Sequence, residues 1–165
     1  YPEIRDRLIM LDGWSKTYAM TGWRLGYAVW PDAAVDHVTR LCINDHSCVN
    51  APTQFAGLAA LTGPQDPVRD MVAQFDARRE VIVNALNDLP GVRCTDCAGA
   101  FYAFPNIEGT GLTAMQAQDK FLDEAGVATV AGTSFGKWGE GYLRFSYANS
   151  TENILEAIGR IRKLL

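Results

Sequence analysis

Apolar residues in the first third of the chain gather in two short runs, at residues 8–11 and 25–30. Each run is too short for a helix and is bounded by polar residues or proline, so both are predicted to be strands. Runs that are apolar throughout are typical of buried strands with neighbours on both sides of a sheet. The connection at residues 12–24 is rich in Gly, Ser and Thr. Polar connections between buried strands often carry functional sites.

Two helices are predicted next. Asp32, directly after Pro31, can cap the first helix. Pro52 can open the second, and Gly63-Pro64 ends it. Helical spacing predicts the inward residues Val35, Val38 and Cys42 in the first helix, and Phe55, Leu58 and Ala59 in the second.

The clearest periodicity begins at Asp66-Pro67 and stops at Pro90-Gly91. A helix of this length often bridges two domains. We therefore predict one domain at residues 1–66 and another at residues 67–165. The residues at helical spacing are Val68, Met71, Val72, Phe75, Ile82, Leu86 and Leu89.

Strand and helix signals alternate in the last third. Strands are predicted at residues 101–104, 127–130 and 142–147, and a helix at residues 113–125 is closed by Gly126. A final helix is capped near Ser150 or Thr151, with Ile154, Leu155, Ile158, Ile161 and Leu165 on its inner face. This alternation predicts the α/β class.

Composition excludes several classes of protein. Hydrophobic residues make up 48% of the 165 residues and charged residues 21%, as in ordinary globular proteins. The net charge of −4 gives no electrostatic footprint for nucleic acid. No apolar run approaches the roughly 20 residues that a membrane span requires. We therefore expect neither nucleic acid nor a membrane as a partner.

The four cysteines include one CxxC pair, Cys94 and Cys97. One CxxC is half of a zinc site, and no second CxxC or histidine pair completes it, so no metal site is predicted. Glycines flank the pair, which indicates a loop or strand rather than the helix start that redox motifs use. We interpret these cysteines as structural. Their number favours a reducing compartment, and a cytoplasmic location is expected.

Lys16 follows the first predicted strand and has no charged neighbour before Arg24. Aromatic residues surround it in the sequence, and such a setting favours the neutral, nucleophilic amine. A neutral lysine attacks a carbonyl to form a Schiff base. Arg24 could grip a phosphate with two parallel hydrogen bonds. The alternatives are a surface lysine and an ordinary ion pair, and these two residues alone do not decide between them.

The whole string at residues 15–27, which includes AMTGWRLGY, resembles the lysine motif of class I and II aminotransferases. These enzymes have fold type I and include the aspartate aminotransferases. The resemblance implies that Lys16 holds pyridoxal 5'-phosphate as a Schiff base and that Arg24 binds the cofactor phosphate. It also implies a homodimer. The chain would form the end of the large cofactor-binding domain and the C-terminal small α/β domain.

Four further segments resemble the same family, at residues 50–54, 99–104, 132–136 and 143–148. The last resembles the strand whose arginine, here Arg144, binds the substrate carboxylate. Strand alternation supports this role, because Arg144 shares a face with Tyr142 and Ser146, opposite the more apolar Leu143, Phe145 and Tyr147.

The chain also departs from the family pattern. Ala131 stands where the glycine loop usually begins with proline, and we expect a looser loop. Gly13 stands where many relatives have a hydroxyl. The family's aspartate at the pyridine nitrogen and tyrosine at the ring oxygen come from upstream, and nothing in residues 1–12 matches them. We therefore expect a missing upstream segment and no activity of this chain alone.

The predicted function is transfer of an amino group between an amino acid and a 2-oxo acid, dependent on pyridoxal 5'-phosphate. One alternative is a carbon–sulfur lyase on the same fold, which would release a sulfide. Another is the aminotransferase-like effector domain of a transcription regulator, which an upstream winged helix would reveal.

Overall fold

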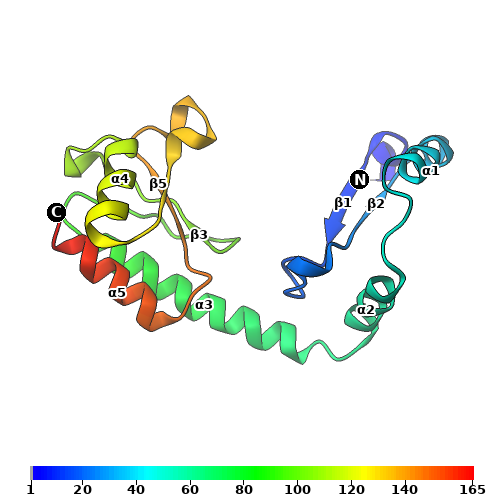
Figure 1. Ribbon diagram of the computed structural model, residues 1–165, viewed down its shortest axis with the longest axis horizontal. Helices are drawn as coiled ribbons and strands as arrows, with labels where there is room; N and C mark the ends of the chain where they lie inside the picture. The colour runs from blue at the N-terminus through cyan, green and yellow to red at the C-terminus, as the bar shows by residue number, and fades with distance from the viewer. Residues whose placement is uncertain (1) are drawn as a thin grey trace. The chain divides into compact units, whose positions relative to one another are not determined.

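A computed structural model describes residues 2–165 and divides the chain between Asp70 and Met71 into two units (Figure 1). Each unit has its own hydrophobic cluster. No helix among the described residues is both long enough and apolar enough to cross a bilayer. The assignment of residues 1–66 and 67–165 to a large and a small domain stays a prediction.

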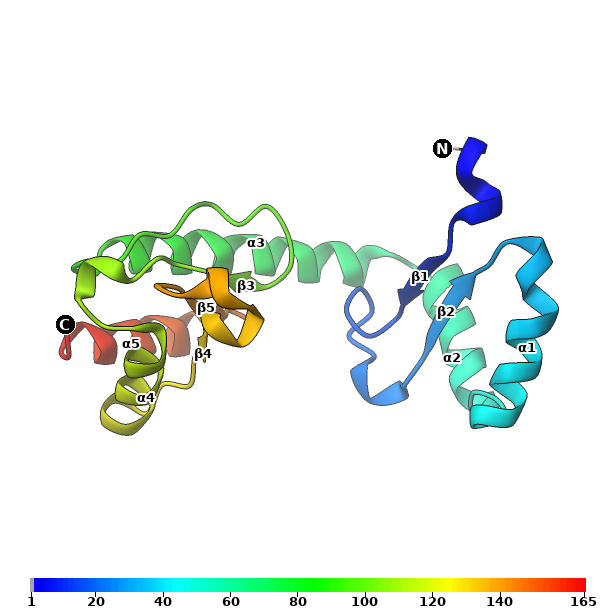
Figure 2. The same ribbon diagram turned by 90° about the horizontal axis from the view of Figure 1, so that it is seen from above.

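The first unit is built on a β-hairpin. Strand β1 (Met10–Gly13) pairs antiparallel with β2 (Gly26–Val29) (Figure 2). In this register Gly13 lies opposite Gly26. A 3-10 turn (Pro2–Arg7) precedes β1, and another (Thr21–Trp23) precedes β2. Helices α1 (Asp32–His46) and α2 (Ala51–Thr62) follow.

Both strands were predicted to be buried, and within residues 2–165 this is wrong. The side chain of Leu11 is 74% exposed, and Leu8, Ile9, Met10, Tyr27 and Val29 are exposed as well. The reason is that β1 and β2 pair only with each other among the described residues, so no further strand covers them.

The two helices of this unit differ in detail from their predicted form. Pro31 occupies the N-cap position of α1 and Asp32 is its first residue, so the predicted Asp32 cap is wrong. Val38 and Cys42 are half-buried on the predicted face, but Val35 is exposed.

Helix α2 begins at the predicted place but buries a different face. Asn50 caps it by accepting a hydrogen bond from the backbone N–H of Thr53 at 3.3 Å. Its buried residues are Thr53 and Gly57, whereas the predicted inward residues Phe55, Leu58 and Ala59 are exposed. The predicted face is therefore wrong.

The second unit packs three helices around a three-stranded sheet. Its helices are α3 (Asp66–Asn87), which enters this unit at Met71, α4 (Ala114–Ala125) and α5 (Thr151–Arg162). Strands β3 (Tyr102–Ala103), β4 (Val130–Ala131) and β5 (Leu143–Ser146) form an antiparallel sheet in the order β3-β5-β4. Helices α3 and α5 run side by side in both views (Figures 1 and 2).

Local signals begin α4 and α5, and end α4, where the sequence predicts. Thr113 forms a capping box with Gln116, Gly126 takes the left-handed conformation after α4, and Ser150 caps α5. The core contains Ile82, Leu86, Phe121, Leu143, Phe145, Tyr147, Ile154, Ile158 and Ile161. Leu155 was predicted to face inward but is half exposed, since its position lies beyond the stripe that α5 buries.

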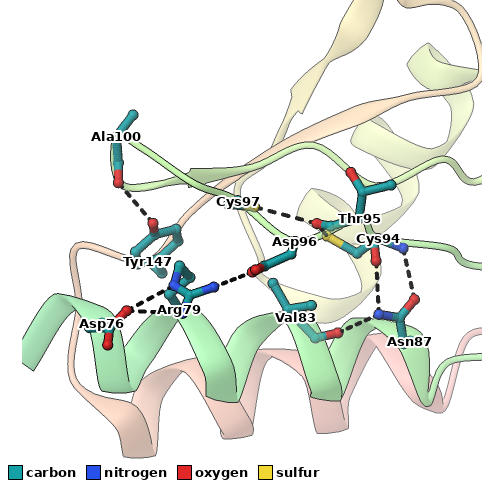
Figure 3. A network of polar contacts seen from close by, with 10 residues as sticks. All are labelled: Asp76, Arg79, Val83, Asn87, Cys94, Thr95, Asp96, Cys97, Ala100 and Tyr147. Carbon is teal, nitrogen blue, oxygen red and sulfur yellow. Dashed lines mark hydrogen bonds and ion pairs between the residues drawn. The ribbon is translucent and has the colours of Figure 1, made fainter.

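The loop after α3 is held by polar contacts (Figure 3). Arg79 forms ion pairs with Asp76 and Asp96. Asn87 bonds both the backbone N–H and the carbonyl of Cys94, at 2.8 and 2.9 Å. Burial raises the pKa of the Cys94 thiol to about 12, with a further contribution from Cys97. A raised pKa disfavours the thiolate, which is the reactive form of a cysteine.

Candidate functional site

Lys16 lies in a tight turn directly after β1. The carbonyl oxygen of Trp14 accepts hydrogen bonds from the backbone N–H groups of Tyr18 and Met20, both at 3.3 Å. The carbonyl of Lys16 itself accepts one from Ala19 at 3.1 Å. Hydrogen bonds thus hold the backbone of the turn, and Lys16 is exposed.

Two residues of this turn belong to a small hydrophobic cluster. Trp14, Met20 and Leu25 are each about nine-tenths buried or more. The indole N–H of Trp14 donates to the carbonyl of Gly57 in α2 at 3.1 Å. A Cβ atom on Gly57 would lie 2.4 Å from a methyl carbon of Leu25, so a larger residue here would require the Leu25 side chain to shift.

Gly13 is tightly packed at the start of the turn. A Cβ atom there would lie 3.1 Å from the carbonyl oxygen of Leu25. The position where many relatives place a hydroxyl therefore has little room for a side chain in this backbone. At Gly13 only the backbone could donate a hydrogen bond to a phosphate.

Arg24 stands at the other end of the connection in the left-handed conformation, with φ 52° and ψ 53°. Ala19 has φ 53° in the same segment. Non-glycine residues with positive φ cost free energy and gather at functional sites. The sequence carries no signal for either conformation, because both residues belong to types that rarely adopt it.

The side chain of Arg24 borders an open pocket of about 700 Å³. Its Nη1 donates to the carbonyl of Thr21 at 3.1 Å, which uses one of the five guanidinium N–H donors. Other polar lining residues are His46, Asn50 and Thr53. This set of donors fits a phosphate. Lys16 does not line the pocket.

Arg144 lies on β5, in the second unit. The core face of the strand is confirmed, because Leu143, Phe145 and Tyr147 are 0%, 7% and 1% exposed. Arg144 points to the opposite face and is half-buried there.

Two aromatic rings hold the Arg144 side chain. Its Cζ lies 4.4 Å from the ring centroid of Tyr102 and 4.8 Å from that of Phe135. No carboxylate among residues 2–165 pairs with Arg144, whereas Arg69, Arg79 and Arg160 each contact an acidic side chain. The sequence pointed to the arginine but missed both rings, although Tyr102 and Phe135 lie inside segments that it singled out.

The three predicted residues thus belong to two units, with Lys16 and Arg24 in the first and Arg144 in the second. Within the first unit, the pinned turn and the left-handed arginine lie at the two ends of one connection. Among residues 2–165, no cluster of histidine, cysteine and acidic side chains could hold a metal ion.

Comparison with known proteins gives consistent matches along the whole chain. The family model described as "Aminotransferase class I and II" matches residues 1–161. The chain is 39% identical over 170 residues to an aspartate aminotransferase of Pyrococcus horikoshii, covering 100% of this chain and 44% of that protein. It is 41% identical over 173 residues to an aspartate aminotransferase of Streptomyces avermitilis, covering 99% of this chain and 42% of that protein.

Solved structures agree. An aromatic aminotransferase from Pyrococcus horikoshii superposes with a TM-score of 0.93 at 38% identity, covering 98% of this chain and 43% of that one. An aspartate aminotransferase from Rhizobium meliloti gives a TM-score of 0.92 at 35% identity, covering 99% and 43%. The chain therefore spans less than half the length of the proteins that it matches.

Proposed function

Because the chain belongs to the class I and II aminotransferase family and has part of its type I fold, we propose that the whole protein transfers an amino group between an amino acid and a 2-oxo acid. Pyridoxal 5'-phosphate is the cofactor in this proposal, and a cytoplasmic homodimer is the working form. The observation that carries the proposal is the match over residues 1–161, which includes the lysine turn and both arginines.

Lys16 is the proposed catalytic residue. When bound, pyridoxal 5'-phosphate supplies a carbonyl and an electron-withdrawing ring that stabilises negative charge at the substrate's α-carbon. Lys16 would hold the cofactor through its side-chain amine, and its Nζ would accept and return the substrate's α-proton. Because hydrogen bonds hold the backbone of the turn, the Lys16 side chain can change position only through its own rotamers.

Arg24 is the proposed phosphate ligand. Its hydrogen bond to Thr21 fixes one edge of the guanidinium and leaves other N–H donors for an anion. The open pocket beside it carries the amide of Asn50. These residues fit a phosphate group by charge and by donor number.

Arg144 is the proposed ligand of the substrate's α-carboxylate. A guanidinium binds a carboxylate through two parallel N–H···O bonds, which fix orientation as well as position. Its replacement by alanine should lower kcat/KM by about 100-fold or more, because hydrogen bonds to charged groups contribute about 1.5–3 kcal/mol each. Cofactor affinity, measured by equilibrium titration, should change little. Unchanged turnover in Arg144→Ala would make it a surface arginine.

Borohydride trapping tests the assignment of Lys16. The whole protein with bound cofactor should absorb in the visible and lose that band on reduction, and peptide mapping should place the label on Lys16. Lys16→Ala should give no label. Lys137→Ala is the matched control, because Lys137 is an exposed lysine that lies over the Trp138 ring, and it should label normally. An unchanged adduct in Lys16→Ala would reject the assignment.

A further inference from the structure

The rings of Tyr102 and Phe135 form a clamp on the Arg144 guanidinium, which we call the aromatic clamp. We propose that Phe135 and Tyr102 are positioning residues that fix the guanidinium plane, so that its N–H edge is presented to the substrate carboxylate. This inference rests on the proposed role of Arg144 as the carboxylate ligand. Neither Tyr102 nor Phe135 carries a charge, so both would act through the position of the guanidinium.

Strand register places Tyr102 beside Arg144. Tyr102 lies opposite Ser146 and Ala103 opposite Phe145, so Tyr102 is a diagonal neighbour of Arg144 on the same face. Two hydrogen bonds from Tyr147 hold the approach to β3. Its hydroxyl donates to the carbonyl of Ala100 at 2.8 Å (Figure 3), and its backbone N–H donates to Phe101 at 3.0 Å. Tyr147 is buried, so this side of the clamp is anchored in the core.

Phe135 belongs to a different segment from Tyr102 and ends the 3-10 turn Gly132–Phe135. It is 54% exposed, so it does not belong to the core. Its ring meets Phe104 edge-on, with centroids 6.1 Å apart, and Phe104 stacks on Tyr142 at 5.2 Å. This aromatic row braces Phe135 against the strands instead of burying it.

Glycines determine where Phe135 is presented. A Cβ atom on Gly132 would lie 2.1 Å from the carbonyl oxygen of Gly139, and one on Gly139 would lie 2.0 Å from that of Gly132. Gly136 has φ 117°, a conformation that side chains disfavour. The two close glycines and the turn at Gly136 therefore fold the loop back so that Phe135 lies over Arg144.

An aromatic clamp suits a guanidinium that must bind an anion. A ring attracts the cation through its π-face and takes up none of the N–H donors along the edge. A carboxylate neighbour would occupy those donors and compete with substrate, as Asp76 and Asp96 occupy Arg79. Among residues 2–165, Arg144 has rings in the place of such acids. Holding the side chain in one geometry also lowers the entropy lost on binding.

The test uses the whole protein loaded with pyridoxal 5'-phosphate. Phe135→Leu and Tyr102→Leu remove one π-face each, while Phe135→Tyr and Tyr102→Phe keep it. Trp138→Leu is the control, because Trp138 is an exposed aromatic residue of the same loop whose cation partner is Lys137. We would measure kcat and KM for L-aspartate and L-phenylalanine with 2-oxoglutarate. Calorimetry gives the Kd of succinate and 3-phenylpropanoate, two carboxylates that cannot transaminate.

Each leucine variant should raise KM and both Kd values by about 3- to 10-fold, with kcat within about twofold. The ring-retaining variants and Trp138→Leu should stay within about twofold of the original protein, and all melting temperatures should agree within about 2 °C. Equal weakening in Trp138→Leu, or loss of affinity only in proportion to lost stability, overturns the clamp.

Arg144→Ala distinguishes a failure of the proposed role of Arg144 from a failure of the aromatic clamp alone. If it leaves both Kd values unchanged, the proposed function of Arg144 fails, and the clamp fails with it. If Arg144→Ala weakens carboxylate binding while Phe135→Leu and Tyr102→Leu do not, the clamp alone is rejected. If Arg144→Ala and both leucine variants weaken carboxylate binding, while Phe135→Tyr and Tyr102→Phe keep the original affinity, the clamp is supported.

Discussion

Replacing Phe121 by alanine should destabilise the second unit by about 3–5 kcal/mol. Phe121 is 1% exposed and lies in a core cluster with Leu86, Leu143 and Ile158. A phenylalanine buries about 150–250 Å² of apolar surface, and about 25 cal/mol per Å² gives roughly 4–6 kcal/mol before relaxation and the burial that the alanine keeps. This loss is a large fraction of the about 5–15 kcal/mol of stability that is typical of a small domain.

Residues 66–165 provide the host for this measurement, because their helices and strands cover one shared core. We expect this fragment to unfold in a single cooperative transition in urea, followed by far-UV circular dichroism. With a slope of about 1.5 kcal/mol per M, Phe121→Ala should lower the midpoint by about 2–3 M. A fragment without any cooperative transition would show that this unit is not an independent domain.

Leu122→Ala is the matched control. Leu122 follows Phe121 in α4 but is 51% exposed, so the same kind of truncation removes little buried surface. Its effect should stay within about 0.5 kcal/mol. Equal destabilisation by the two variants would refute the reasoning, since burial would then not explain the loss.

Three further outcomes are expected. The 165-residue chain alone, with added pyridoxal 5'-phosphate, should turn over amino acids far more slowly than about 1 per second, and a rate near that value would contradict the expectation of inactivity. Gly132→Ala should cost about 1–3 kcal/mol in urea unfolding because its Cβ meets the backbone of Gly139, whereas Gly159→Ala, with open space around its Cβ, should not destabilise α5. Cys94 should resist a thiol reagent at pH 8 until unfolding, while Cys48 reacts. Because folding raises the pKa of Cys94 from 9.0 to about 12, its contribution to stability should be present below pH 9 and lost as the pH rises toward 12.

The sequence determined the features that depend on neighbours along the chain. Asn50, Thr113 and Ser150 start helices because their side chains accept hydrogen bonds from backbone N–H groups a few residues on. Strand alternation by itself places Arg144 on the face opposite the core. The string around Lys16 identified the family, and the matches confirm it. The roles of Lys16, Arg24 and Arg144 remain predictions.

Contacts between distant segments decided the rest. Helical spacing predicts an apolar face on α2 that contains Phe55 and Leu58. In the structure the buried residues of α2 are instead Thr53 and Gly57, and Gly57 packs against Trp14 and Leu25. Hydrophobicity alone cannot predict this, because the closest packing at this point needs the smallest side chain. The rings on Arg144 come from β3 and from the glycine loop, so no local pattern could join them. Spacing along a chain determines which residues share a face, and only the tertiary structure decides what that face meets.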